Sequence, residues 1–170
     1  MARFFDCLDF VLECEGGFTD DPADPGGLTK YGVTQAVYDE WRDKQSLPHQ
    51  TVRLIEAKEA QSLYKTLYWD KAKCGVLPQP LDLLHFDSAV NLGVGTANKL
   101  LQTALGMVAI DGVLGPQTAM ALERANPLVT FARYANTRIL RYVTLALLDP
   151  RREKFLRGWL RRVGLLLQET

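Results

Sequence analysis

A glutamate followed by two glycines and an acidic loop is the part of this sequence with the clearest capacity for chemistry. Glu15 ends a strongly apolar stretch, and Gly16 and Gly17 follow it directly. A carboxylate at the C-terminal end of a helix lies near the negative end of the helix dipole, and cover by a folded-back loop would add desolvation. Both effects raise the pKa of a carboxyl group, which suits a general acid that keeps its proton near neutral pH.

The loop after Glu15 carries carboxylates that we expect to stay ionised. Asp20, Asp21 and Asp24 lie among the glycines and prolines of residues 18–33. A protonated acid opposite a charged base is the pair that glycoside hydrolysis uses. A solvated helix end with an acidic turn is the alternative interpretation. A calcium loop is disfavoured because the acids lack the alternating spacing and the distant glutamate of an EF-hand, so we predict no metal site.

The elements that must position these residues are expected to be helical. Apolar residues cover most of residues 4–15, which predicts a buried first helix ended by the glycine pair. Thr34 is placed to cap the next helix, and a short hairpin is expected near residues 28–33. Further helices are expected at about 34–43, 52–69, 81–92, 96–105, 116–125, 127–148 and 151–167. The predicted class is therefore all-α or mostly helical, with at most that one hairpin.

The bulk composition is that of an ordinary globular protein. The chain has 170 residues, of which 47% are hydrophobic and 24% charged. No apolar run reaches the ~18 residues that a membrane helix needs, and Asp6 and Asp9 argue against a secretory signal. The three cysteines, Cys7, Cys14 and Cys74, lack C-x-x-C spacing and are expected to be buried thiols.

The charge is unevenly distributed although the net charge is zero. Residues 1–90 carry nine Lys/Arg and fifteen Asp/Glu, whereas residues 91–170 carry eleven and five. This asymmetry predicts either an anionic partner for the second half or attraction between the halves. The basic and apolar residues of 151–162 leave a similar choice between a packed amphipathic helix and contact with an anionic wall or membrane.

Several segments resemble glycoside hydrolase family 108, N-acetylmuramidases of Gram-negative bacteria and their phages that were once labelled secretion activator proteins. The closest runs are Glu-Gly-Gly-Phe from residue 15, Asp-Asp-Pro-Ala-Asp-Pro-Gly-Gly from 20 and Thr-Lys-Tyr-Gly-Val-Thr from 29. Residues 63–70 and 86–93 fit the same family, and residues 100–102 and 111–118 resemble its predicted peptidoglycan-binding region. The resemblance implies a lysozyme-like catalytic lobe over residues 1–90 and a helical peptidoglycan-binding-like lobe over residues 91–170.

The resemblance also implies an activity. A peptidoglycan hydrolase of this family would cleave the β-1,4 bond between N-acetylmuramic acid and N-acetylglucosamine without a cofactor, and its catalytic glutamate corresponds to Glu15. Glu13, two residues earlier, would face another side of the helix. Phage-type lysozymes add an aspartate after eight intervening residues and a threonine after five more, and here Asp24 follows after eight and Thr29 after four. Asp24 is thus expected to hold or activate the attacking water with help from Thr29. The alternatives are Asp20 in that role and a purely positional role for both aspartates.

Side chains that could stack on sugar rings or bind them by hydrogen bonds form the candidate substrate site. They are Asp20, Tyr31, Thr34, Tyr68, Trp69, Asp87 and Asn91. Core packing is the alternative for Tyr68 and Trp69, and a bond to a neighbouring loop is the alternative for Asp87 and Asn91. His85 is expected to be a core histidine rather than a ligand.

Two rival functions remain open from the sequence. One is a lytic transglycosylase that uses Glu15 alone, and the other is a non-catalytic module that binds the wall or assists secretion. The expected partner is the peptidoglycan glycan strand, with no nucleic acid, no stable membrane insertion and a monomeric chain. A phage or prophage endolysin made in the cytoplasm without a signal peptide, and released to act in the periplasm, fits these expectations.

Overall fold

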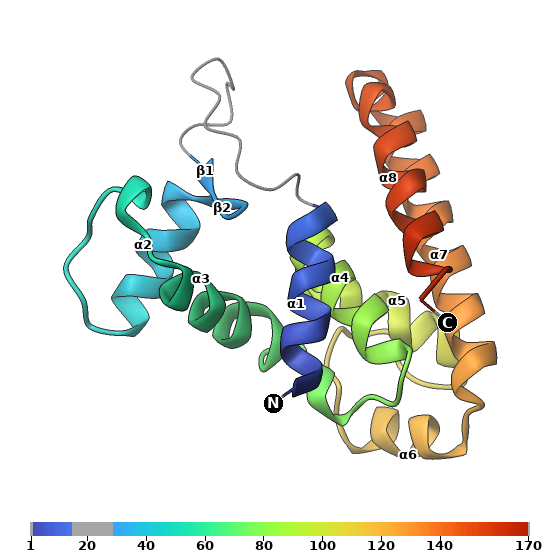
Figure 1. Ribbon diagram of the computed structural model, residues 1–170. Helices are drawn as coiled ribbons and strands as arrows, with labels where there is room; N and C mark the ends of the chain where they lie inside the picture. The colour runs from blue at the N-terminus through green and yellow to red at the C-terminus, as the bar shows by residue number, and fades with distance from the viewer. Residues whose placement is uncertain (1, 15–28, 170) are drawn as a thin grey trace. The chain divides into compact units, whose positions relative to one another are not determined.

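The computed structural model describes residues 2–14 and 29–169, and its described helices and strands are drawn in colour in Figure 1. The chain divides into two compact units, Met1–Lys71 and Ala72–Thr170. The lobes expected from the sequence, residues 1–90 and 91–170, stay a prediction.

The first unit begins with α1, Ala2–Cys14, where the sequence predicts a buried helix. The buried side chains are Phe4, Cys7, Leu8 and Val11, which recur at the spacing of one helical face. The helix therefore packs through a single apolar stripe.

A two-residue turn joins β1, Thr29–Lys30, to β2, Val33–Thr34, in an antiparallel hairpin that pairs Thr29 with Thr34. Tyr31 and Gly32 form the turn with φ values of 58° and 71°. Two positive φ angles are typical of a type I′ turn, whose twist matches that of the strands. The hairpin expected near residues 28–33 is confirmed.

The second helix, α2, covers Gln35–Lys44 and starts directly after β2. Thr34 is its N-cap, and its Oγ1 accepts a hydrogen bond from the backbone N–H of Val37 at 3.4 Å. The cap predicted at Thr34 is confirmed, so hairpin and helix are joined without a linker.

The prediction of a single helix over residues 52–69 is wrong, because the regular α-helix covers only the middle of this segment. The segment consists of a 3₁₀ turn η1, Val52–Leu54, then α3, Ala57–Tyr64, then a π-helical turn η2, Lys65–Trp69. Glu56 is extended and forms a capping box with Glu59, which starts a new helix after η1. In η2 the backbone N–H of Asp70 reaches the carbonyl of Lys65 at 2.8 Å, which widens the last turn.

The second unit is built around α4, Leu81–Leu92, which follows the 3₁₀ turn η3, Cys74–Val76. Every residue from 81 to 89 is buried. A helix buried on all sides belongs to the middle of a core, and α4 indeed packs against α5, Val94–Leu105, and against α7, Pro127–Leu148.

The remaining helices are α6, Pro116–Arg124, and α8, Glu153–Leu166, the latter preceded by the 3₁₀ turn η4, Pro150–Arg152. Proline opens both α6 and α7, where its missing N–H leaves no hydrogen bond unmade. Figure 1 shows α8 lying alongside α7, and the rings of Tyr142 and Trp159 stack between them at 4.9 Å. These helices agree with the predicted ones to within a few residues.

The described part of the chain is therefore mostly helical with one short hairpin, as predicted. No described helix is both long and apolar enough to cross a membrane. The expected buried thiols are confirmed for Cys7 and Cys74, while Cys14 is partly exposed.

Candidate active site

Three of the predicted site residues, Glu15, Asp20 and Asp24, lie outside the described residues. The structure describes the element on either side of them: α1, which ends at Cys14, and β1, which begins at Thr29. Thr29 pairs through its backbone with Thr34 in the hairpin.

The hairpin turn holds Tyr31 in a conformation that side chains rarely adopt. Its φ of 58° lies in the left-handed region, which costs a residue other than glycine about 1 kcal/mol or more. The hydroxyl of Tyr64, on α3, donates a hydrogen bond to the Tyr31 carbonyl at 3.0 Å. The Tyr31 ring is half-buried, with Lys30 Nζ at 5.7 Å from its centroid. Strained residues held by their neighbours are common at functional sites.

The π-helical turn η2 presents its two aromatic residues differently. Trp69 is buried and meets the ring of Phe4, on α1, edge-on at 5.5 Å. Tyr68 is half-exposed, and its ring lies 5.7 Å from that of Tyr64. Core packing thus describes Trp69, whereas Tyr68 keeps part of its ring accessible. Single π turns inside helices are frequent at functional sites.

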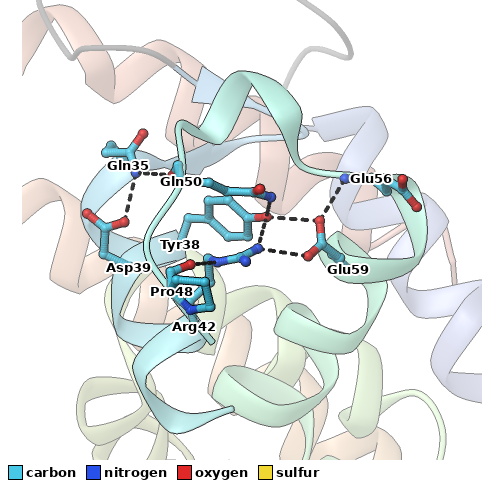
Figure 2. A network of polar contacts seen from close by, with 8 residues as sticks. All are labelled: Gln35, Tyr38, Asp39, Arg42, Pro48, Gln50, Glu56 and Glu59. Carbon is cyan, nitrogen blue, oxygen red and sulfur yellow. Dashed lines mark hydrogen bonds and ion pairs between the residues drawn. The ribbon is translucent and has the colours of Figure 1, made fainter. Parts of the chain in front are cut away.

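A polar network joins α2, α3 and the loop between them (Figure 2). The Tyr38 hydroxyl donates to Glu59 Oε2 at 2.9 Å and accepts from Arg42 Nη1 at 2.8 Å and from Gln50 Nε2. Arg42 Nη1 also lies 3.1 Å from Glu59 Oε1, and its Nε donates to the carbonyl of Pro48. Burial is the main cause that raises the pKa of Tyr38. The network fixes the scaffold next to the hairpin.

The sequence analysis does not single out this network. Its one sequence signal is the pair of glutamates, Glu56 and Glu59, with the spacing of a capping box. Glu59 is the shared member, since it caps α3 and accepts from Tyr38.

In the second unit, Asp87 lies on α4 and is fully buried between two arginines. Its Oδ2 is 2.6 Å from Arg138 Nη1, on α7, and its Oδ1 accepts from Arg162 Nε, on α8, at 2.8 Å. Burial opposes the charged form of Arg138, but the charge of Asp87 and contacts with Tyr142 outweigh it and raise the pKa of Arg138. The cluster therefore holds two positive charges and one negative charge in the core.

Asn91, one turn after Asp87, is tied to the same cluster. The Tyr142 hydroxyl donates to Asn91 Oδ1 at 2.6 Å and accepts from Arg138 Nε at 2.9 Å. The structure thus ties Asp87 and Asn91 to one cluster, and their partners come from α7 and α8 rather than from a neighbouring loop. Sequence analysis missed these partners, Arg138, Tyr142 and Arg162.

His85 is the core histidine that the sequence predicts. Its Nδ1 lies 2.9 Å from the Tyr134 hydroxyl and its Nε2 lies 3.1 Å from the Ala72 carbonyl. Complete burial lowers the pKa of His85 to about 4. Among the described residues, no group of three His, Cys, Asp or Glu side chains is arranged to hold a metal ion.

Comparison with known proteins decides the family. The family described as Glycosyl hydrolase 108 matches residues 8–93. This chain belongs to the glycosyl hydrolase 108 family. A second family, described as Predicted Peptidoglycan domain, matches residues 96–164 of this glycosyl hydrolase 108 protein. The two matches indicate a peptidoglycan hydrolase, with a domain that binds peptidoglycan and places its action on the cell wall.

Solved structures agree with this family. The structure of Brucella abortus SagA is similar to this chain with a TM-score of 0.80 and 28% sequence identity. The similarity covers 97% of this chain and 91% of that one, and it confirms the predicted lysozyme-like, mostly helical fold. No curated protein matches the glycosyl hydrolase 108 chain.

The buried ion cluster crosses the boundary between the two family matches. Asp87 lies in the glycosyl hydrolase 108 match, whereas Arg138 and Arg162 lie in the peptidoglycan-domain match. By packing, all three belong to the second compact unit. The last helix of the glycosyl hydrolase 108 region is therefore held inside the helices of the peptidoglycan domain.

Proposed function

We propose that this glycosyl hydrolase 108 chain is an N-acetylmuramidase that cleaves the β-1,4 bond between N-acetylmuramic acid and N-acetylglucosamine, with Glu15 as the general acid. The observation that carries the proposal is the family match over residues 8–93, which includes the Glu-Gly-Gly run. The position of Glu15 supports it, because this residue directly follows Cys14, the last residue of α1. The negative end of a helix dipole favours a protonated carboxyl group.

The proposed reaction needs a proton donor and a held water. The carboxyl of Glu15 gives its proton to the glycosidic oxygen as the bond to the sugar carbon breaks. A water held by Asp24 or Thr29 then attacks that carbon and gives a proton to the Asp24 carboxylate. The product is a free reducing sugar, and no cofactor takes part. The separation of the two carboxyl groups would decide whether the configuration is inverted or retained.

Substrate contacts are proposed for Asp20, Tyr31 and Tyr68. The half-buried rings of the two tyrosines support this role, because each keeps part of its surface accessible to a sugar ring. The other candidates have internal partners that favour a structural role within their own unit, namely Thr34 and Trp69 in the first unit and Asp87 and Asn91 in the second.

Digestion of purified peptidoglycan sacculi by matched glutamate variants tests the proposal. Glu15→Gln removes the proton donor, and we expect a loss of roughly 10²- to 10⁴-fold in the rate of turbidity decrease. Glu13→Gln is the control, because Glu13 is exposed on α1 two residues earlier. We expect it to digest sacculi at close to the wild-type rate.

The products distinguish the proposal from its rivals. Mass spectrometry of the digest should show reducing N-acetylmuramic acid ends, whereas anhydro ends would assign a lytic transglycosylase. If Glu15→Gln digests sacculi at the wild-type rate, Glu15 is not the catalytic acid. If neither the wild type nor any variant digests sacculi, a non-catalytic wall-binding role is favoured. We further propose that the chain acts as a monomer in the periplasm, where the wall of a Gram-negative cell lies.

A further inference from the structure

A groove lies in the second unit, in the part of the chain that matches the peptidoglycan domain. The end of α5, the residues after it, α6 and the first turns of α7 line a volume of about 570 Å³. All of these residues are described, and all lie within residues 96–164. The groove is thus complete within one compact unit.

The groove has an apolar lining that stays open to solvent. Met107 is fully exposed, and Met120 and Val129 are about half exposed, at 51% and 49%. Apolar side chains gathered at a concave surface are typical of a binding site. Methionine is well suited to such a site, because its flexible thioether adapts to the shape of a ligand.

Two positive charges face the same groove. Arg124, at the end of α6, and Arg133, on α7, both line it, and no aspartate or glutamate does. Within the described residues, neither guanidinium makes an ion pair or a hydrogen bond to another side chain. Residues 96–164 as a whole carry eleven Lys/Arg and four Asp/Glu, a net charge of +7. The groove therefore fits a ligand that combines carboxylates with small apolar groups.

The side chains that line the groove also indicate which part of peptidoglycan would bind there. No aromatic side chain lines the groove, although sugar-binding sites commonly stack sugar rings on aromatic ones. The peptide stems of peptidoglycan, in contrast, alternate alanine methyl groups with free carboxylates. We propose that this groove binds the peptide stem of peptidoglycan rather than its glycan strand, an inference that rests on the wall being the substrate of this chain.

A stem-binding groove has a clear use for a hydrolase of an insoluble polymer. Binding of one stem would keep the chain on the wall between cleavage events. The second contact then becomes intramolecular, and the effective concentration of the glycan near the catalytic region rises.

Titration of the isotope-labelled full-length chain, followed by nuclear magnetic resonance, tests the proposal. One titrant is the tetrapeptide L-Ala-γ-D-Glu-meso-diaminopimelate-D-Ala, and the other is a peptide-free glycan oligomer. We expect the tetrapeptide, at millimolar concentration, to shift the amide signals of residues 105–108, 117–126 and 129–133. The glycan should leave these signals in place. The proposal is overturned if the tetrapeptide causes no shift there, or if the glycan shifts the same amides.

Matched arginine variants test the charge contribution. We expect Arg124→Gln and Arg133→Gln each to weaken tetrapeptide binding by roughly threefold or more. Met120→Glu, which adds a carboxylate to the lining, should weaken it further. Arg141→Gln is the control, because Arg141 is exposed on α7 and does not line the groove. Equal weakening by Arg141→Gln would overturn the proposal.

The outcome is separable from that of the proposed muramidase activity. Tetrapeptide binding requires no bond cleavage, so Glu15→Gln should bind the tetrapeptide as the wild type does. If the protein fails to digest sacculi, the proposed muramidase activity is wrong. The titration with the tetrapeptide then still tests the groove by itself.

Discussion

At the scale of single residues, Asp87 is the centre of the second unit. One fully buried carboxylate faces the guanidinium groups of Arg138 and Arg162, at 2.6 and 2.7 Å. Removing a charge from the interior of such a cluster is costly, because the remaining charges stay buried without compensation. The side chain therefore acts on the stability of α4, the last helix of the glycosyl hydrolase 108 match, by pairing it with arginines of the peptidoglycan-domain match.

Asp87→Asn tests this role. We expect the variant to lower the free energy of unfolding by about 3–5 kcal/mol, since it leaves two buried arginines without their counter-charge. Urea denaturation followed by circular dichroism measures the change. The control is Asp70→Asn, whose ion pair with Lys65 at 2.6 Å is exposed and worth about 1 kcal/mol at most. Equal effects of the two substitutions would contradict the role given to Asp87.

His85 gives the fold a defined response to acid. Burial lowers its pKa from 6.5 to about 4, so the unfolded chain takes up the proton first as the pH falls. The neutral imidazole thus contributes stability that is complete above pH 6.5 and is lost between pH 6.5 and pH 4. The loss should reach about 3 kcal/mol, from 1.36 kcal/mol for each pKa unit.

Unfolding free energies measured at pH 7 and pH 4.5 test this response. His85→Gln should reduce the difference between the two values, because the variant lacks the titrating group. The control is Arg141→Gln, an exposed substitution that leaves both histidines in place and should keep the wild-type difference. The same difference in His85→Gln as in the wild type would show that other groups cause the acid response.

At the scale of elements, local signals account for most of what the sequence predicts. Thr34 and the prolines that open α6 and α7 specify helix starts by short-range chemistry, and these starts are confirmed. The helix expected over residues 52–69 fails because apolar periodicity continues across Glu56, where the capping box begins a new helix. The partners of Asp87 could not be predicted, because Arg162 lies 75 residues away in sequence and the pairing depends on how α4, α7 and α8 pack.

The turn between α5 and α6 shows how one side chain can organise a loop. The Gln102 amide donates to Asp111 Oδ1 at 2.8 Å and to the Val113 carbonyl at 3.0 Å, and its Oε1 accepts from the N–H of Gly112 at 2.8 Å. Gly112 has a φ of 82°, and an added Cβ would lie 3.3 Å from the carbonyl oxygen of Gly95. The turn thus needs glycine for both its backbone and its packing.

Gly112→Ala should therefore destabilise the second unit. We expect a loss of about 1–3 kcal/mol in the free energy of unfolding, from the left-handed backbone and the close contact. Gly158→Ala is the matched control, because a Cβ at this position in α8 meets nothing within 4 Å. That substitution should stabilise the helix by up to about 1 kcal/mol. Thermal unfolding compares the two, and effects of the same sign would contradict this account of the turn.

At the scale of the whole molecule, the net charge has opposite signs in the two regions that the family models match. Residues 8–93, the glycosyl hydrolase 108 match, carry eight Lys/Arg and fourteen Asp/Glu, a net charge of −6. Residues 96–164 carry a net charge of +7. The sequence leaves two explanations, attraction between the two regions or attraction of the basic region to an anionic partner. Peptidoglycan is such a partner, because its peptide stems bear free carboxylates.

The dependence of wall binding on salt decides between these explanations. The screening length falls from about 10 Å at 0.1 M salt to about 3 Å at 1 M, so attraction between exposed charges fades over this range. We expect co-sedimentation of the Glu15→Gln protein with sacculi to decrease severalfold as salt rises, while Glu15→Gln prevents digestion during the measurement. Sacculi whose stem carboxylates have been amidated are the control and should bind weakly at every salt concentration. Binding to untreated sacculi that does not change with salt would favour attraction between the two regions of the chain over attraction of the basic region to the wall.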